Sequence, residues 1–345
     1  MADRVLHTLF HVSDLHVGEI DADGYPGLPD AIVKRWWRIH KECYGFLGHT
    51  FQAMRQLEEF FADATAGVPT TLVVTGDLTT CGADAEFDIA TAFLTNEATF
   101  PSGRSVGLRA TDVLGRSVPG NHDHWPGRQW ILGPRNERLL RVFPDRPFKP
   151  QIVNLSDANR LIIFGINTDE DVHGFGPSRL FGRAKCVSQL IALEEQLKAF
   201  DDADGDIRVL LLHHSRMHQE RRLGLTTATL DRLNRVIEKG RISALLCGHL
   251  HVPAVKIQRI ADAQTSWNLI EARCGTTLQR DIVPESWVQA GFASATLEPN
   301  NLLVHQIVEL DGAIEWRTAS YTRTDRGFRE QPLADNGPVT LWKRV

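Results

Sequence analysis

The sequence predicts an α/β fold because two patterns alternate along most of its 345 residues. Short apolar runs rich in Leu, Ile and Val end in polar residues, which is typical of buried strands. Between these runs lie stretches whose apolar residues recur at helical spacing. This alternation indicates layers of helices packed on a sheet. After Pro253 the pattern changes to successive β-rich segments, which predict hairpins in a second sheet packed on the first.

The predicted strands of the first sheet are short apolar runs. Each run ends in polar residues, so functional side chains are expected where each strand ends. The runs cover residues 6–14, 71–77, 116–123, 160–167, 208–214 and 243–251.

Helical periodicity predicts four helices between these strands. The last of them has Thr226 or Thr227 as the expected N-cap and Gly240 as the expected C-terminal stop. The four predicted helices cover residues 30–64, 84–98, 186–200 and 226–239.

The chain is expected to form one domain over residues 1–322, since no internal repeat, low-complexity tract or linker divides it. The β-rich part of that domain, which we assign to the second sheet, covers about residues 254–322. Residues 323–345 are polar and punctuated by Gly and Pro, so we expect a C-terminal tail that wraps the surface or is mobile.

The segment 18–70 is rich in aromatic residues and separates the first two predicted strands by an unusually long stretch. Its pattern favours an amphipathic helix with one buried face. An alternative is that its N-terminal half forms a lid over a substrate or the surface of a homodimer.

The composition excludes some classes of function and localisation. A formal net charge of −5 argues against a broad basic surface for nucleic acid or for an anionic membrane. The five cysteines are scattered and form no CxxC pair, so they indicate neither a disulfide framework nor a thiolate zinc site. We find no export signal and no apolar stretch of about 18 residues, and therefore expect a cytoplasmic protein.

Side chains that can bind a metal ion follow several of the predicted strands. Asp14 and His16 follow the first run, and His249 and His251 close the last. In an extended segment, residues two apart point to the same side, so each pair presents its side chains together. Ligands in open α/β sheets bind outside the carboxyl ends of the strands, where residues distant in sequence converge. The other strand ends contribute Asp77, Asn121, His122 and His213.

The ordered motifs D-x-H, G-D, G-N-H-D, H and G-H-x-H span residues 14–251 and resemble those of the calcineurin-like metallophosphoesterase superfamily. The resemblance implies a four-layer α/β/β/α sandwich of two mixed sheets. Within that superfamily, the GNHD and LLLHHS forms most resemble the branch of cyclic-nucleotide and glycerophosphodiester phosphodiesterases.

The resemblance also implies a centre of two divalent metal ions with Asp77 as the bridge. Carboxylate, imidazole and amide ligands suit Mn, Fe, Zn, Co or Ni. Neighbouring residues of a strand point to opposite faces, so only one of His213 and His214 can face the ions, and the resemblance selects His213. One ion would be held by Asp14, His16, Asp77 and His251, and the other by Asp77, Asn121, His213 and His249.

The reaction implied by the resemblance is hydrolysis of a small phosphodiester, of the cyclic-nucleotide or glycerophosphodiester class, by in-line attack of a hydroxide that bridges the ions. His122 would stabilise the transition state or protonate the leaving group, and Asp123 would orient it. The alternatives are a phosphomonoesterase or a DNA-repair-type nuclease with the same metal site, and a scaffold that keeps the fold without catalysis.

Other residues near these motifs have structural interpretations as well as functional ones. His124 and Trp125 either contact the substrate or pack their loop. Gly76, Gly120 and Gly248 are expected to let the backbone turn sharply where the ligands converge. Five further histidines are interpreted as structural residues with satisfied hydrogen bonds. They are His7, His11, His40, His49 and His305.

Overall fold

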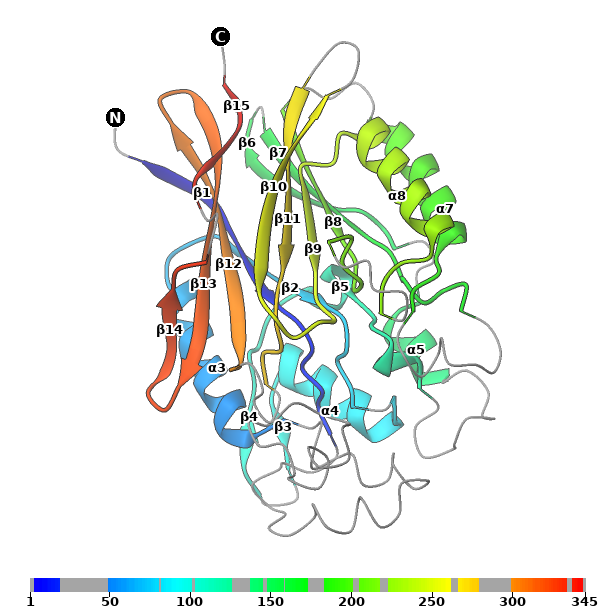
Figure 1. The fold of residues 1–345 in the computed structure, drawn as a ribbon. Coiled ribbons are helices and arrows are strands. Elements are labelled where there is room, and N and C mark those ends of the chain that lie inside the picture. Colours follow the sequence, from blue (N-terminus) through cyan, green and yellow to red (C-terminus); the bar gives the residue numbers. More distant parts are fainter. Residues whose placement is uncertain are drawn as a thin grey trace.

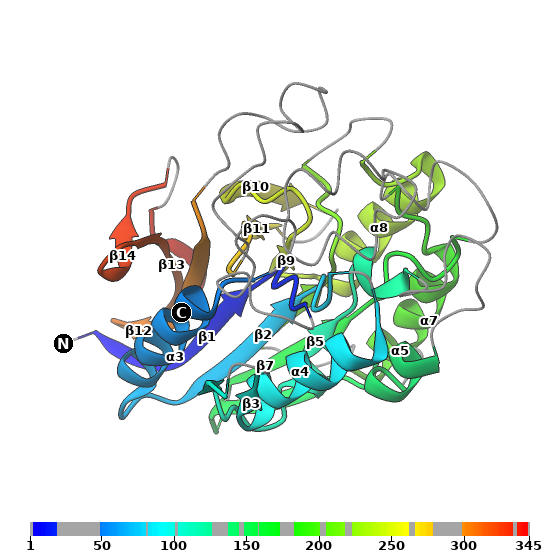
Figure 2. The same cartoon turned by 90° about the horizontal axis from the view of Figure 1, so that it is seen from below.

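In the computed structural model, two mixed sheets pack against each other, and helices cover their outer sides (Figures 1 and 2). Helices of the two outer layers lie on opposite sides of the molecule in both views. The four layers confirm the fold class predicted from the sequence. The structure describes residues 3–18, 49–80, 82–100, 103–125, 137–144, 148–157, 159–172, 183–200, 205–217, 223–261, 266–278, 299–333 and 337–343.

The first sheet joins the N-terminal and C-terminal parts of the chain. Its strands are β1 (Arg4–Val12), β2 (Thr70–Thr75), β5 (Ser117–Val118), β12 (Asn301–Leu310), β13 (Ala313–Thr324), β14 (Gly327–Gln331) and β15 (Val339–Lys343). Their order is β14-β13-β12-β1-β2-β5, and β15 also pairs with β13. Strands β1, β2 and β5 run parallel, whereas β12 is antiparallel to β1.

The second sheet comes from the middle of the chain. Its strands are β6 (Gln151–Ser156), β7 (Asn159–Gly165), β8 (Asp206–Leu211), β9 (Ala244–Cys247), β10 (Ala254–Ala261) and β11 (Ser266–Arg273). Their order is β10-β11-β9-β8-β7-β6, and β7, β8, β9 and β11 run parallel. A separate short hairpin consists of β3 (Ala98–Thr99) and β4 (Ser105–Val106).

Strand partners differ from the prediction in two respects. The β-rich segment 254–322 does not form a sheet of its own, because β10 and β11 extend the sheet of β9 while β12 and β13 extend the sheet of β1. The expected tail from residue 323 contains β14 and β15, which pair with β13. Pairing at existing sheet edges satisfies backbone groups that a separate sheet or a tail would leave to solvent.

The strand predicted over 116–123 is also much shorter than expected. Only Ser117 and Val118 pair with β2, and His122–His124 form the 3₁₀ helix η5. Pro119 follows directly and has no backbone N–H to continue a ladder.

Helices α3 (Phe51–Thr65) and α4 (Asp84–Thr95) cover the first sheet. The Thr50 side chain caps α3 by accepting from the backbone N–H of Ala53. On the sheet, the ring of Phe10 meets those of Phe60 and Phe61 with centroids 5.8 and 5.0 Å away. Helix α3 is the C-terminal part of the helix predicted over 30–64, and the N-terminal part of that prediction lies outside the described residues.

Helices α7 (Val187–Leu197) and α8 (Thr227–Gly240) cover the second sheet (Figure 1). Thr226 is confirmed as the N-cap of α8, since its hydroxyl accepts from the N–H of Thr229. The left-handed residue after α8 is Arg241 rather than Gly240. Gly240 is needed for packing, because a Cβ there would lie 2.6 Å from Leu197 Cδ1. The shorter helical segments are α5 (Glu137–Val142), η4 (Leu114–Arg116) and η6 (Lys198–Phe200).

Side chains of the second sheet alternate between two apolar clusters. In β7, Leu161 and Ile163 belong to the cluster between the sheets, whereas Ile162 and Phe164 belong to the cluster under α7 and α8. Among the described residues, no helix has the length and apolar character needed to cross a membrane.

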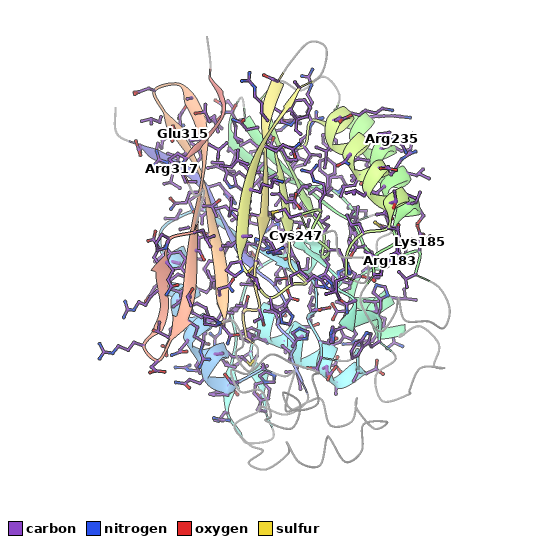
Figure 3. All side chains as sticks on the ribbon, viewed as in Figure 1. Arg183, Lys185, Arg235, Cys247, Glu315 and Arg317 are labelled. Carbon is purple, nitrogen blue, oxygen red and sulfur yellow. The ribbon has the colours of Figure 1, made fainter. Side chains whose placement is uncertain are left out.

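The described cysteines are free thiols in the interior. Figure 3 shows Cys247 near the centre of the molecule, whereas Glu315 and Arg317 lie on β13 at its side. Burial and the charge of Glu271 raise the pKa of the Cys247 thiol well above its usual value, so this thiol is chemically inert.

Three histidines form hydrogen bonds across buried strands of the first sheet, as expected for structural residues. His7 Nε2 lies 2.9 Å from Thr71 Oγ1, and His11 Nε2 lies 2.9 Å from Thr75 Oγ1. His11 Nδ1 is 3.3 Å from His305 Nε2. Burial lowers the pKa of His7 to about 4 and that of His11 to about 3, and it lowers the pKa of His305 well below its usual value.

Because the pKa values of these histidines are lowered in the folded protein, we expect the protein to lose stability in mild acid. Above pH 6.5 they are neutral in both the folded and the unfolded chain, so they contribute nothing to the pH dependence. Below that pH the unfolded chain takes up protons that the folded chain refuses, which lowers the free energy of unfolding by about 1.4 kcal/mol per pH unit for each histidine. The free energy of unfolding of metal-free protein is measured in urea from pH 7.5 to 5. His305→Gln is expected to reduce its change with pH by about 1.4 kcal/mol per pH unit below pH 6.5. The same change with pH in the variant and the wild type would contradict a lowered pKa of His305.

Candidate metal centre

The predicted ligands lie where five strands end, at the junction of the two sheets. Strands β1, β2 and β5 of the first sheet lead to Asp14, Asp77 and Asn121, and strands β8 and β9 of the second lead to His213 and His249. Backbone pairing continues past the strand ends, since the Asp14 and His16 N–H groups donate to the carbonyls of Gly76 and Asp77, both at 3.0 Å. These bonds hold the loop after β1 against the loop after β2.

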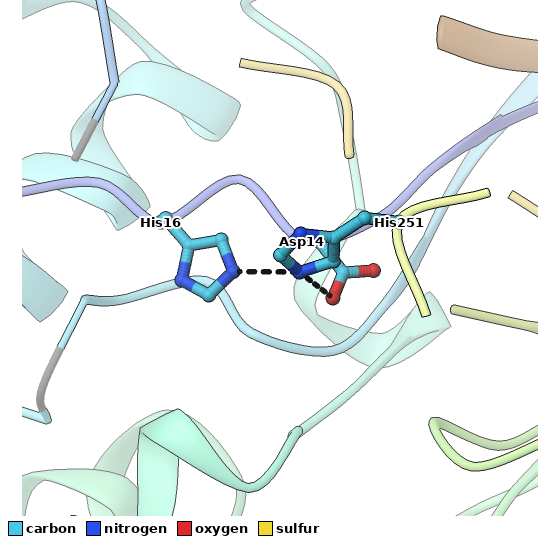
Figure 4. A group of neighbouring side chains, drawn as sticks. All are labelled: Asp14, His16 and His251. Carbon is cyan, nitrogen blue, oxygen red and sulfur yellow. Dashed lines mark hydrogen bonds and ion pairs between the residues drawn. The ribbon is translucent and has the colours of Figure 1, made fainter. Parts of the chain in front are cut away.

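The first group of ligand atoms comes from Asp14, His16 and His251 (Figure 4). His251 Nε2 is 3.3 Å from Asp14 Oδ1 and 3.3 Å from His16 Nε2. His16 Nε2 is also 3.9 Å from Asp77 Oδ2. Four predicted ligands of the first ion thus direct their donor atoms at a common point.

The second group surrounds the same Asp77 oxygen. His213 Nε2 is 3.3 Å from Asp77 Oδ2 and 3.2 Å from Asn121 Oδ1. His249 Nδ1 lies 3.1 Å from that same Asn121 oxygen. Asp77 Oδ2 therefore lies beside both groups of candidate ligands.

A buried polar atom without a hydrogen-bond partner indicates that this donor set fits cations. Among the described residues, His249 Nε2 is buried and takes part in no hydrogen bond, and the contact of Asp14 Oδ1 is with another candidate ligand, His251 Nε2, at 3.3 Å. His213 Nδ1 donates to the Thr75 carbonyl at 2.7 Å, and Nε2 on the other side of the ring faces Asp77 and Asn121. Metal-bound histidines are typically oriented in this way, through the second ring nitrogen.

Backbone strain is concentrated at the same residues. Positive φ values are uncommon outside glycine and cost free energy, so they persist where the surroundings impose them, often at functional sites. Five of the nine described non-glycine residues with positive φ are predicted ligands: Asp14 (50°), His16 (46°), Asp77 (50°), His249 (77°) and His251 (57°).

The glycines of the motifs allow the loops to approach each other closely. Only Gly76 has a positive φ, of 103°, so the expected sharp turn applies to it alone. A Cβ on Gly120 would lie 2.2 Å from Asp77 Oδ1, and a Cβ on Gly248 would lie 1.9 Å from Ser13 Oγ. These two glycines leave room for the side chains that surround the ligands.

Electrostatics keep the buried carboxylates ionised. Burial raises the pKa of Asp14, but the hydrogen bond and charge of His251 outweigh it and hold the value at about 2. For Asp77, burial is likewise outweighed, chiefly by the charge of His213, so its pKa lies well below the usual value. Both carboxylates therefore stay negative at neutral pH, as cation ligands must.

The histidines around these carboxylates divide into two kinds. Burial lowers the pKa of His16 and His249 to about 3, with the charges of His122 and His213 adding to the effect. For His213, burial is outweighed by the charge and hydrogen bond of Asp77, which raise the pKa to about 10.

His122 is oriented by the backbone rather than by Asp123, which corrects the predicted contact. His122 Nδ1 donates to the Thr80 carbonyl at 2.7 Å, and the ring stacks on Trp125 with centroids 4.0 Å apart. The Asp123 carboxylate is directed away from it and accepts from the N–H groups of Leu78, Thr79 and Gly120 at 2.9 to 3.1 Å. Asp123 therefore braces the loop that carries Asp77.

His214 lies on the other side of its strand and makes a separate set of contacts. Its Nδ1 is 2.7 Å from Thr168 Oγ1 and 3.7 Å from Asp169 Oδ2. Burial, and then the charge of Asp77, raise the pKa of Asp169 to about 7 against the opposing charge of His213. Neither Thr168 nor Asp169 was among the predicted site residues, although both follow the apolar run 160–167, where the same strand-end signal applies.

The comparisons with known proteins identify one family. The model of the family described as calcineurin-like phosphoesterase matches residues 7–253, which include all seven predicted ligands. No curated protein matches the chain.

Several solved structures match the chain at low sequence identity and with TM-scores below 0.5. A putative 5'-nucleotidase from Staphylococcus aureus is 12% identical with a TM-score of 0.42, and the match covers 100% of this chain and 55% of that one. A dimetal phosphatase from Danio rerio is 10% identical with a TM-score of 0.43, covering 98% and 100%. The purple acid phosphatase PPD1 from yellow lupin is 12% identical with a TM-score of 0.43, covering 95% and 53%. The chain thus spans about half the length of the first and third of these proteins.

Proposed function

Since this chain belongs to the calcineurin-like phosphoesterase family, we propose that it is a dinuclear metal-dependent phosphoesterase that hydrolyses a small phosphodiester. The observation that carries the proposal is the position of Asp77 Oδ2, 3.3 Å from His213 Nε2 and 3.9 Å from His16 Nε2. One carboxylate oxygen beside two sets of ligands is the arrangement that a pair of bridged cations requires.

In this proposal, seven side chains hold the two ions. Their oxygen and nitrogen donors suit Mn, Fe, Zn, Co or Ni. Two such ions polarise a phosphoryl oxygen and stabilise the negative charge that develops at phosphorus. The first ion is held by Asp14, His16, Asp77 and His251, and the second by Asp77, Asn121, His213 and His249.

The chain's own groups bind, orient and move protons around these ions. Asp14, His16 and Asp77 are buried, whereas His122 and His251 are partly exposed, so the substrate approaches from their side. His122 holds a hydrogen at Nδ1 for the Thr80 carbonyl, which leaves Nε2 for the substrate. We assign to the imidazolium form of His122, which carries a second proton at Nε2, the delivery of that proton to the leaving oxygen.

Support for a diester substrate comes from the GNHD and LLLHHS motifs, which most resemble the phosphodiesterase branch of the family. The net charge of −5 favours a small substrate over DNA. The complete set of ligands favours an enzyme over a scaffold. A cytoplasmic location belongs to the same proposal.

Metal removal and a substrate panel test the proposal. Dialysis against a chelator is expected to abolish hydrolysis of bis-p-nitrophenyl phosphate, and added Mn²⁺ is expected to restore it, because the ions supply the charge stabilisation. With Mn²⁺, rates are then compared for cyclic nucleotides, glycerophosphodiesters, phosphomonoesters and single-stranded DNA. Faster monoester hydrolysis would favour a phosphomonoesterase, and salt-sensitive DNA cleavage a nuclease. Two bound ions without any turnover would favour a scaffold.

A further inference from the structure

We propose that His214, Thr168 and Asp169 form a positioning unit that fixes the orientation of His249 and so determines the affinity of the second cation. The inference rests on the proposed dinuclear function, but it concerns residues outside the set of seven ligands. Its basis is a contact between rings and a chain of hydrogen bonds, both on the side of the centre formed by the second sheet.

The His214 ring packs against both histidines of the second group. Its centroid is 4.2 Å from that of His249, with a tilt of 41°, and 5.1 Å from that of His213, with the rings nearly perpendicular. His213 and His249 themselves are 5.1 Å apart. The side chains of His213 and His214 are fully buried. Because the three rings pack on one another, movement of His214 changes the space available to His249.

The orientation of His214 is held by contacts with Thr168 and Asp169. His214 Nδ1 and Thr168 Oγ1 share a hydrogen bond of 2.7 Å. Thr168 Oγ1 is also 3.4 Å from Asp169 Oδ2, and His214 Nδ1 is 3.7 Å from that same carboxylate oxygen. His214 Nδ1 is therefore occupied by these two residues.

The loop that carries Thr168 and Asp169 is held in turn by its neighbours. Asn167 Oδ1 accepts from the Asp169 N–H at 3.1 Å and from His124 Nε2 at 2.9 Å. Asn167 Nδ2 donates to Glu170 Oε2 at 2.8 Å. His124 directly follows the G-N-H-D motif that contains Asn121, so these hydrogen bonds connect the loop after β7 to a loop of the other sheet that carries a candidate ligand.

His249 depends on such support because its backbone is strained. Its φ is 77°, a conformation that an unsupported histidine rarely adopts. Partners that orient a ligand without touching the metal typically change metal affinity by about 10- to 100-fold. We therefore expect that disrupting the unit lowers the affinity for the second ion by about that factor. The affinity for the first ion, held by Asp14, His16 and His251, should stay unchanged.

The test measures Mn²⁺ binding to metal-free protein and needs no turnover. Isothermal titration gives the two affinities, and electron paramagnetic resonance distinguishes a coupled Mn²⁺ pair from a single ion. The variants are Thr168→Val, which removes the hydroxyl, Thr168→Ser, which keeps it, and His214→Ala, which removes the ring that packs on His249. His305→Gln is the control for the loss of a buried histidine elsewhere in the fold, and circular dichroism checks folding.

Thr168→Val and His214→Ala are expected to lower the affinity for the second ion only. At limiting Mn²⁺ these two variants should also lose the resonance signal of the coupled pair. Thr168→Ser and His305→Gln should keep both the affinity and the signal. Unchanged Mn²⁺ binding by a folded Thr168→Val protein would overturn the inference. An equal loss of affinity for both ions would overturn it as well. The proposed function fails separately, if wild-type protein with two coupled ions hydrolyses no phosphoester. If His214→Ala does not fold, the two Thr168 variants decide the question.

Discussion

Asp77→Asn is expected to abolish hydrolysis of bis-p-nitrophenyl phosphate, with a loss of at least about 1,000-fold, equivalent to about 4 kcal/mol in the activation free energy. The physical reason is the shared position of Oδ2, which lies 3.3 Å from His213 Nε2 and 3.9 Å from His16 Nε2. An amide cannot supply the negative charge that two cations share, and its NH₂ group would repel them. Activity and bound Mn²⁺ are measured on the same preparation.

The substitution is chosen to leave the backbone intact. Asp77 has a φ of 50°, which asparagine tolerates well and alanine tolerates poorly. Its Oδ1 accepts from the His122 N–H at 2.8 Å, a bond that the amide oxygen can keep. Asp112→Asn is a matched control, because Asp112 has a φ of 53° and lies exposed outside the centre. If Asp77→Asn kept both ions and full turnover, Asp77 would not be the bridge.

The sequence contains enough to predict the layers of this fold but not the partners of its strands. Apolar runs and helical periodicity locate β1, β2, β7, β8 and β9 because burial on both faces leaves an uninterrupted apolar signal. The pairing of β12 with β1 joins His305 to Leu9 across almost the whole chain. Both sheets present edges that accept an antiparallel strand, and a pattern of alternating residues does not specify which edge it joins.

The candidate centre shows a similar division. The side chains that converge at the centre are predictable, because each lies at the end of an apolar run and the motifs occur in family order. The groups that orient them are not predictable in the same way. Asp123 follows His122 in sequence, yet it bonds to backbone N–H groups of the Asp77 loop. That choice depends on which buried donors lack partners once the loops have packed, which is a property of the tertiary structure.

His122→Ala is expected to reduce turnover by about 100- to 10,000-fold for substrates with a poor leaving group, while both ions stay bound. The Thr80 carbonyl 2.7 Å from Nδ1 and the stacked Trp125 ring fix the ring, so in the imidazolium form the second proton, at Nε2, is the one available to the substrate. Loss of an acid matters most when the leaving oxygen is basic. A glycerophosphodiester should therefore lose far more activity than bis-p-nitrophenyl phosphate, whose phenolate leaves without a proton.

The ratio of the two losses distinguishes proton donation from other roles of this ring. His122 also lies in a group with His16 and Asp77 whose ligand atoms are all within 4.8 Å of one another. If it were a ligand, His122→Ala would lower the content of bound Mn²⁺ and reduce both substrates equally. If it only stabilised charge at phosphorus, the ions would remain and the two losses would again be equal. A large loss confined to the alkyl leaving group, with both ions retained, is the outcome that proton transfer from Nε2 requires.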